Sequence, residues 1–456
     1  MGEERFGQHL KQIVSNISYE YQDGRLSGIA FLNLVIEKLP RDLLQRHSQH
    51  LFLPLVLQLV NDDSKDCRVE VSNCISTLLK RSSVELLQTF QDYCSRWLKQ
   101  TGPLRLASLQ VFGLLVESRA EFLKSKSLVD LWIQRLEEAL YKREESDWED
   151  TYFALICVEK LTKDFNSILL RHSKLMTSII ECLINPHPWI KMSSSRILNH
   201  FFTSNSAEEF LSQKNGILFE IVRNILFQFN VSEEEQSQDL SDLGVKTLTL
   251  ALPLMVENPQ FCYAEENLIE KESTSENVQD PVFWLLRRLS QIAKAKGSKR
   301  RMTVFKCYAA FTISNFAIVA PNLELMLEGL HRSNIEAKNE IENQELSQRR
   351  TSSSFSNDQH DAPVTEHSFA EEVLSLIEEK CTSSSDFLNA YAEVKRRAYN
   401  KKQRRKTEQK IEAATNPQAA ADRRMKKQER NKRRKKRRSE EQARERRGGE
   451  KKYRHN

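Results

Sequence analysis

The 456-residue sequence is 39% hydrophobic with only 12 Gly and 11 Pro, a composition that favours helix over sheet and a length that exceeds one compact core. Its formal charge of +6 is unevenly divided, because residues 395–456 hold 27 Lys and Arg against 8 Asp and Glu, net +19, which leaves −13 on residues 1–394. No run of 18 apolar residues and no apolar leader occurs, so neither a membrane span nor a secretion signal is predicted.

Apolar residues recur at helical spacing through the first 345 residues. Breaks such as Gln22–Gly24, Asp62–Ser64 and Thr101–Pro103 separate the stretches, and a capping-box pattern at Ser146–Glu149 predicts a helix start. The predicted helices are 26–39, 43–60, 68–79, 84–98, 104–116, 128–141, 168–184, 190–202, 217–229, 240–256, 282–293, 299–319 and 322–342, with a further helix before 22 and another that the capping box opens.

One stretch, Asn185–Phe202, contains the pattern that the others repeat. A proline turn precedes an apolar residue beside a basic one, then the small Ser193–Ser195, then Ile and Leu. Apolar–basic pairs recur at Arg68-Val69, Leu104-Arg105, Val245-Lys246 and Phe305-Lys306. A two-helix unit of ~40–47 residues is typical of HEAT and armadillo repeats. We therefore predict an all-α, HEAT/armadillo-like α-solenoid over 1–345, with a generic helical bundle as the alternative.

Three further segments follow the predicted solenoid. Residues 346–367 are Ser-rich and aperiodic, which predicts a disordered linker. Residues 368–394 predict short docking helices, with a capping box at Ser368–Glu371 and an apolar stripe at Phe387, Leu388, Tyr391 and Val394. Residues 395–456 form a Lys/Arg-rich tail that we expect to be partly helical or disordered.

The basic tail carries the strongest functional signal. Lys and Arg neutralise phosphates and give sequence-independent affinity for nucleic acid, and such blocks also serve as nuclear import signals. The tail contains few aromatic residues, so contact with the phosphate backbone is favoured over base stacking. The predicted nucleic-acid-binding or nuclear-localisation residues are Lys395, Arg396, Arg397, Lys401, Lys402, Arg404, Arg405, Lys406, Arg423, Arg424, Lys426, Lys427, Lys432, Arg433, Arg434, Lys435, Lys436, Arg437 and Arg438.

Catalysis has little support in this sequence. No phosphate-binding loop, nucleophile elbow or metalloprotease motif is present, so no catalytic residue, metal or cofactor is predicted. His172, Cys182 and His187 match no zinc spacing, and we interpret them as packing and loop residues. Trp189 is interpreted as a staple over the neighbouring helix pair.

Several blocks resemble the small-subunit processome component 20 family, very large HEAT-repeat proteins of the U-three snoRNA-containing complex, near their C-terminal end. The blocks are 21–39, 51–62 and 185–202, together with the Lys/Arg-rich C-terminus, and the HPW of His187–Trp189 with the apolar–basic pair and serines after it is the most specific. This chain is far shorter than those proteins, so it is interpreted as a fragment, a short isoform or a split product.

The resemblance implies a non-catalytic scaffold in nucleolar pre-18S rRNA processing and small ribosomal subunit assembly, located in the nucleus and nucleolus. The implied partners are pre-ribosomal RNA, U-three snoRNP proteins and other processome scaffold proteins, with no membrane and no small-molecule substrate. The alternative is a HEAT-repeat adaptor, transport protein or chaperone whose acidic body grips basic protein cargo.

Overall fold

The structure is a computed structural model in which the described residues form helices and turns, with no strand among them. They fall into two compact units, Met1–Lys380 and Cys381–Asn456, and each unit is described by itself. The described residues are 3–125, 128–141, 148–204, 207–212, 215–230, 237–263, 280–294, 298–348, 366–381, 384–418, 421–426, 428–433 and 436.

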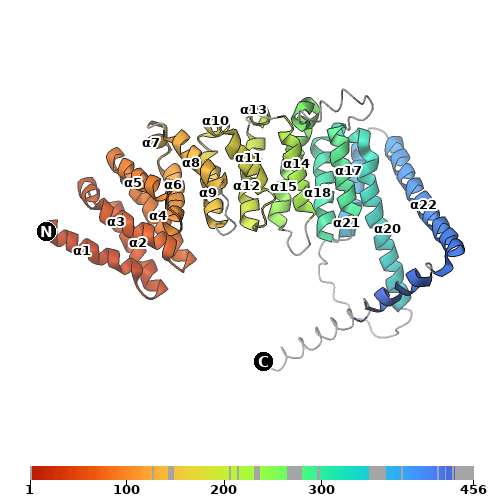
Figure 1. The fold of residues 1–456 in the computed structure, drawn as a ribbon, viewed down its shortest axis with the longest axis horizontal. Helices are drawn as coiled ribbons and strands as arrows, with labels where there is room; N and C mark the ends of the chain where they lie inside the picture. Colours follow the sequence, from red (N-terminus) through yellow and green to blue (C-terminus); the bar gives the residue numbers. More distant parts are fainter. Residues whose placement is uncertain are drawn as a thin grey trace. The chain divides into compact units, whose positions relative to one another are not determined.

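The helices of the first unit follow one another along the chain (Figure 1). They are α1 (Glu3–Ser15), α2 (Gln22–Lys38), α3 (Arg41–Asn61), α4 (Lys65–Arg81), α5 (Val84–Trp97), α6 (Pro103–Ser118), α7 (Ala120–Ser125), α8 (Val129–Tyr141), α9 (Trp148–Leu161), α10 (Asn166–Leu169), α11 (Ser173–Cys182), α12 (Pro188–Thr203), α13 (Ala207–Leu211), α14 (Ile217–Phe229), α15 (Gln238–Glu257), α17 (Pro281–Lys294), α18 (Ser298–Ser314), α19 (Phe316–Val319), α20 (Leu323–Gln348) and α21 (Glu366–Lys380).

Local sequence explains many of the helix starts. Ser64 and Ser83 cap α4 and α5, each accepting a hydrogen bond from a backbone amide three residues on, and Pro188 is the first residue of α12. The predicted break at Gln22–Gly24 is wrong, because α2 already begins at Gln22. The real break lies earlier, where Arg25 Nη1 donates to the Tyr19 and Glu20 carbonyls and holds that segment extended ahead of the helix.

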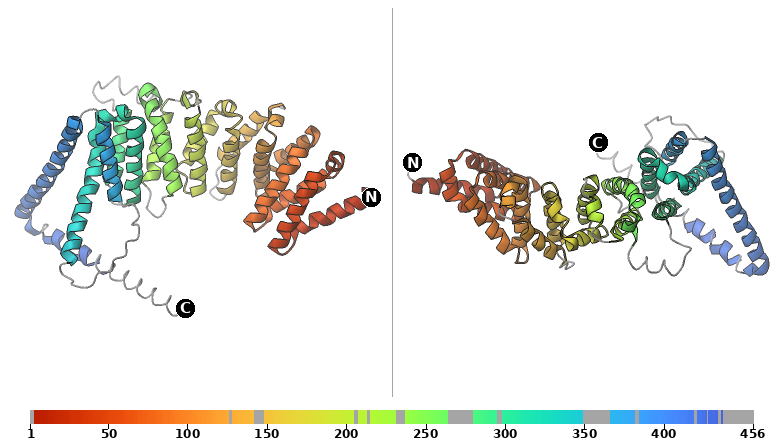
Figure 2. Two further views of the ribbon diagram at one scale, coloured as in Figure 1. Left: turned by 180° about the vertical axis from the view of Figure 1, so that it is seen from behind. Right: turned by 90° about the horizontal axis from the view of Figure 1, so that it is seen from above.

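Helix α12 shows how the first unit is packed. It contacts α9 on one side and α15 on the other, and α11 is its antiparallel neighbour along the chain (Figures 1 and 2). Ile197, Leu198 and Phe201 are fully buried on its apolar stripe. Ser194 is also buried, and its hydroxyl donates to the Ile179 carbonyl at 2.5 Å. The small serine run thus lets the neighbouring helix approach, as the sequence predicts.

Long-range hydrogen bonds reveal the repeat directly. Side chains of one helix pair repeatedly bond groups of the preceding or following pair at sequence separations of 37 to 48 residues, which matches the predicted period. The separations widen to 64–70 beside residues 264–279, where a polar insertion lies between the bonded pairs. Bonds at the shorter period include Arg81→Ile36, Arg119→Ser82, Arg135→Ser95, His200–Thr162, Asn224→Ile180, Gln228→Leu183 and Asn199→Thr247.

Helix α21 packs on α18 and α20 at the end of the first unit. Arg301 of α18 pairs with Glu366 of α21 at 3.0 Å and with Glu336 of α20 at 2.8 Å. The predicted capping box at Ser368 is wrong, because α21 already includes Glu366, which accepts from Arg301 and from the Ser333 hydroxyl at 2.9 Å. The predicted helix start at Ser146 and most of the predicted linker lie outside the described residues.

Candidate nucleic-acid interface

The second unit contains one long helix, α22 (Ser384–Thr415), whose C-terminal half is strongly basic. Shorter helical stretches follow within residues 417–433. All the described members of the predicted basic set are solvent-exposed, from Lys395 in α22 to Lys436. The predicted residues outside the described part of the chain are Lys427, Arg434, Lys435, Arg437 and Arg438.

The start of α22 is amphipathic. Phe387 and Val394 are buried, whereas Leu388 is 57% exposed, so its predicted place in the apolar stripe is wrong. The Phe387 and Tyr391 rings stack with centroids 5.7 Å apart, and the Lys395 ammonium lies 4.1 Å from the Tyr391 ring centroid. This cation–π contact fixes the first tail cation against the helix.

One face of α22 neutralises its own charges. Glu393 pairs with Arg396 at 2.5 Å and with Arg397 at 2.9 Å, and Arg404 pairs with Glu408 at 2.9 Å. The hydrogen bond from Arg396 is the largest cause that lowers the pKa of Glu393 below its ordinary value. These three arginines therefore have carboxylate partners within the helix itself.

A second face of α22 carries four cations, Lys401, Lys402, Arg405 and Lys406, which we call the cationic face. At 3.6 residues per turn these side chains fall within an arc of about 140°. All four are exposed, and none has an ion-pair partner among the described residues. Like charges at (i, i+4) repel one another, so an external polyanion would relieve the repulsion on this face.

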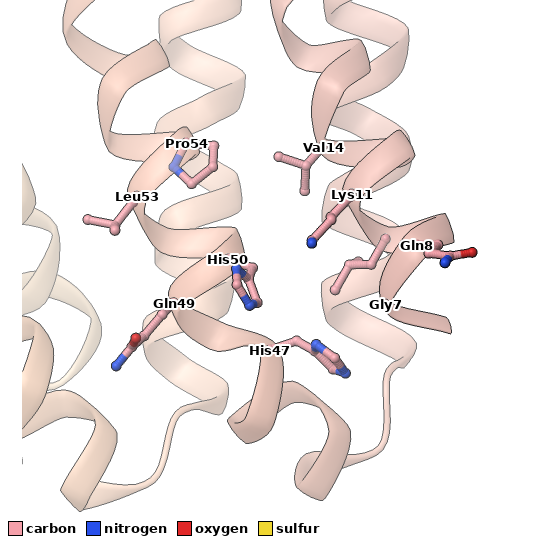
Figure 3. Close-up of a pocket in the computed structure, with 10 residues that line it drawn as sticks. Gly7, Gln8, Lys11, Val14, His47, Gln49, His50, Leu53 and Pro54 are labelled. Atoms are coloured by element: carbon pink, nitrogen blue, oxygen red, sulfur yellow. The ribbon is translucent and has the colours of Figure 1, made fainter. Parts of the chain in front are cut away.

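A groove lies between α1 and α3 in the first unit (Figure 3). Lys11, His50 and Val14 point into the space between the two helices, and His47 lies below them against Phe6, with ring centroids 5.4 Å apart. The lining combines an ammonium, two imidazoles and apolar carbons. Sequence reasoning did not single out this groove, because its residues come from two helices whose polar positions look ordinary when taken singly.

The structure shows what surrounds His172, Cys182 and Trp189, for which the sequence predicts packing and loop roles. His172 lies 3.5 Å from Asp130, Cys182 is fully buried in α11, and among the described residues no group of His, Cys, Asp and Glu could hold a metal ion. The Trp189 ring lies 5.4 Å from that of Trp148 and 5.7 Å from that of Tyr152, yet 56% of the residue stays exposed.

No single helix in the described part of the chain has both the length and the apolar composition of a membrane span. One pair, Arg300–Ser314 and Phe316–Glu336, reaches that composition only jointly and is bent by 115°. Its Tyr308 and Phe311 side chains are fully buried among the surrounding helices.

Comparison with known proteins identifies homologous sequence. No family model matches. Two curated proteins do, both described as U3 small nucleolar RNA-associated protein 20: the one from Saccharomyces cerevisiae is 28% identical over 250 residues and the one from Schizosaccharomyces pombe 27% over 246 residues. This chain contains a region homologous to U3 small nucleolar RNA-associated protein 20. The matches cover 54% and 52% of the chain but only 10% of each relative.

The fold has counterparts among solved structures. A chain in a structure described as Kap95p bound to RanGDP superimposes with a TM-score of 0.50, covering 84% of this chain and 49% of that one at 10% identity. At that identity the likeness concerns the fold alone. Together with the 37–48-residue bonding period, it identifies a HEAT/armadillo-like α-solenoid, as the sequence predicts.

Proposed function

We propose that the chain is part of a non-catalytic scaffold in the nucleolar small-subunit processome, acting in pre-18S rRNA processing and small-subunit assembly. The homology to two proteins named as U3 small nucleolar RNA-associated supports the assignment. The stacked helices supply surfaces for processome proteins, and the basic helix and tail contact RNA phosphates. The observation that carries the RNA contact is the cationic face of α22, four exposed charges that have no ion-pair partner in the described part of the chain.

The contact is with the phosphate backbone and not with bases. Tyr399 is the only aromatic residue among the described residues after Lys395, and the other tail aromatic, Tyr453, lies outside them. Stacking on aromatic rings is the usual way to hold single-stranded bases, whereas lysine and arginine need only the phosphates. The expected binding is therefore sequence-independent and strongly dependent on salt.

The test replaces Lys401, Lys402, Arg405 and Lys406 by Gln in the full chain. Each phosphate contact to single-stranded RNA contributes about −0.7 to the slope of log K against log salt, so the slope should flatten by about 3. The control replaces Arg396, Arg397 and Arg404 by Gln, three cations that already have carboxylate partners. RNA binding is followed by fluorescence anisotropy between 50 and 200 mM KCl. Equal loss in both variants would contradict a role for the cationic face.

The adaptor alternative makes a different prediction from the same molecule. A carrier of basic cargo would use the acidic surface of residues 1–394, whose net charge is −13, and its binding would not depend on RNA. Sedimentation of the tagged chain with pre-ribosomal particles, before and after ribonuclease, separates the two functions. Loss of co-sedimentation after ribonuclease supports the scaffold, and an unchanged association with basic proteins supports the adaptor.

A further inference from the structure

A second cationic site lies in the first unit, in a cleft formed where α3 and α5 begin and α4 and α6 end. The cleft has a volume of about 300 Å³, and four cations line it: Arg41, Lys80, Arg81 and Arg119. No Asp or Glu is among the described residues that line it. This concentration of positive charge stands out within residues 1–394, whose net charge is −13.

Two of the arginines are held rigidly by backbone carbonyls. Arg81 Nη1 donates to the Ile36 carbonyl at 2.6 Å, and Arg119 Nη1 donates to the Ser82 carbonyl at 3.0 Å. These bonds satisfy carbonyls at and just beyond the ends of α2 and α4. A guanidinium has five N–H donors, and the bonds found for both arginines among the described residues use Nη1 alone. The remaining N–H groups are therefore preoriented for another acceptor.

Of the four cleft cations, Arg81 and Arg119 are half-buried, and Arg41 and Lys80 are exposed. Several other buried or half-buried cations of the first unit have a carboxylate partner. Arg25 pairs with Asp62, Arg105 with Asp150, and Lys160 with Glu117. By contrast, no ion pair involves Arg41, Lys80, Arg81 or Arg119 in the described part of the chain. The cleft also includes Ser83 at the N-terminus of α5, where the helix dipole adds positive potential.

Three of these arginines recur at the repeat period. Arg41, Arg81 and Arg119 are 40 and 38 residues apart, so successive repeats place a guanidinium at the same edge of the array. The apolar lining is limited to Leu44, Val84 and Leu86, of which Leu44 and Leu86 are buried in the core. A protein partner would need apolar anchors, which this cleft does not offer. Phosphate groups need only charge and N–H donors.

We propose that this cleft binds the backbone phosphates of an RNA strand, as a second contact separate from the cationic face of α22. The inference rests on the proposed function for the identity of the polyanion. Arg81 and Arg119 provide fixed N–H donors, while the exposed Arg41 and Lys80 add charge at the rim. RNA would then have phosphate contacts with the first unit through this cleft and with the second unit through the cationic face.

The experiment substitutes Arg41→Gln and Lys80→Gln in the full chain, because both side chains are exposed and make no hydrogen bond among the described residues. Anisotropy with a labelled 20-nucleotide RNA of mixed sequence should show the salt slope flattened by about 1.4 and affinity about tenfold lower at 0.15 M KCl. The control, Arg171→Gln with Lys174→Gln, removes the same charge from exposed positions outside the cleft. An equal effect in the control overturns the inference.

Two further measurements complete the test. A poly-glutamate peptide that displaces the RNA from the wild type, and loses this ability in the Arg41/Lys80 variant, would assign the cleft to an acidic protein and overturn the RNA assignment. The α22 variant distinguishes the two proposals: if it alone loses RNA, the tail contact stands and the cleft inference fails. If the cleft variant alone loses RNA, the cleft inference stands and the tail contact fails. Unchanged unfolding midpoints by circular dichroism confirm that both variants are folded.

Discussion

At the scale of single residues, Arg25 and Asp62 form the most specific polar contact of the first repeats. Arg25 donates from Nε to Asp62 Oδ2 and from Nη2 to Oδ1, both at 3.0 Å, and the Asp62 side chain is fully buried. Nη2 also reaches Asp63 at 2.6 Å, but that side chain is 88% exposed. The buried bidentate pair fixes the register of α2 against the end of α3.

Asp62→Asn should lower the free energy of unfolding by about 2 kcal/mol, the scale for losing hydrogen bonds to a charged group. Burial alone raises the pKa of Asp62, but hydrogen bonds from Arg25, the Ser64 amide and Gln58 bring it below its ordinary value. The stabilisation is therefore complete above about pH 4 and is lost as the pH falls through the folded pKa. Urea denaturation at several pH values should show that the difference in free energy of unfolding between the wild type and Asp62→Asn becomes smaller below pH 4.

Asp63→Asn is the matched control for that experiment. Its carboxylate contacts the same guanidinium but is solvated, so the expected change is below about 0.5 kcal/mol at any pH. Similar losses in the two variants would mean that burial does not distinguish the two carboxylates, and the argument from the Asp62 contact would fail.

Alanine substitutions at two glycines are expected to have opposite effects on stability, because the two sites differ in how closely another helix or turn packs against them. A Cβ on Gly28 in α2 would lie 2.9 Å from the Asn16 carbonyl oxygen, whereas a Cβ on Gly7 in α1 would meet only His47 at 3.7 Å. Gly28→Ala should therefore destabilise the chain by about 1–3 kcal/mol, as overpacking does. Gly7→Ala should be neutral or stabilising by up to about 1 kcal/mol, because alanine is the better helix former. Thermal unfolding of both variants is the measurement, and a stable Gly28→Ala would contradict the close approach.

At the scale of helices, α14 caps the end of α11 through buried amides. Asn224 donates to the Ile180 carbonyl at 3.1 Å and Gln228 to the Leu183 carbonyl at 2.7 Å. The Gln228 bond supplies a donor to a carbonyl at the helix end, and the Asn224 bond adds a second donor to a carbonyl that also accepts from the Leu183 amide. The same solution recurs with arginine in the N-terminal repeats, where Arg119 and Arg135 reach carbonyls of the preceding pair.

Asn224→Ala should cost about 1 kcal/mol, because it removes a buried hydrogen bond while the Ile180 carbonyl keeps the bond from the Leu183 amide. Gln238→Ala serves as the control, since Gln238 is exposed and, within the described part of the chain, its side chain bonds only Asp242 of its own helix. Amide hydrogen exchange should also accelerate at the C-terminal end of α11 in the first variant. Unchanged exchange there would indicate that the Asn224 bond contributes nothing to holding that helix end.

The helices themselves could be predicted from sequence more securely than their ends. Apolar positions such as Ile197, Leu198 and Phe201 recur at the helical period, and this pattern is local. The start of α2 was misplaced because it depends on Arg25 bonding two carbonyls beyond the helix. The start of α21 was misplaced because Glu366 is held by α18 and α20, which are distant in sequence.

At the scale of the whole molecule, the two cationic sites differ in how readily they can be predicted from the sequence. The basic tail is a continuous charge run, so composition alone located it. The division of α22 into a self-paired face and the cationic face needed the helix and the positions of Glu393 and Glu408. The cleft cations are scattered over three repeats, and only their spacing at the repeat period could have indicated that they converge.

In a solenoid, local destabilisation of one repeat has little effect beyond the adjacent repeats. A substitution in α21 tests this expectation. Glu366→Gln removes one of the two carboxylates that hold Arg301, whose side chain is only 5% exposed. Weakening the contact by about 1.4 kcal/mol should speed amide exchange in Glu366–Lys380 about tenfold. Because repeats interact only with adjacent ones, exchange in α4 and α6 should not change.

Glu371→Gln provides the control for this variant, because Glu371 lies on the same helix, is largely exposed and, among the described residues, has an ion pair only with His367 one turn away. It should leave exchange in α21 within about twofold of the wild type. Faster exchange spread through α4 and α6 in the Glu366 variant would mean that the whole array unfolds as one unit. Faster exchange confined to α21 and its neighbours α18 and α20 would show that the array loosens one repeat at a time from this end.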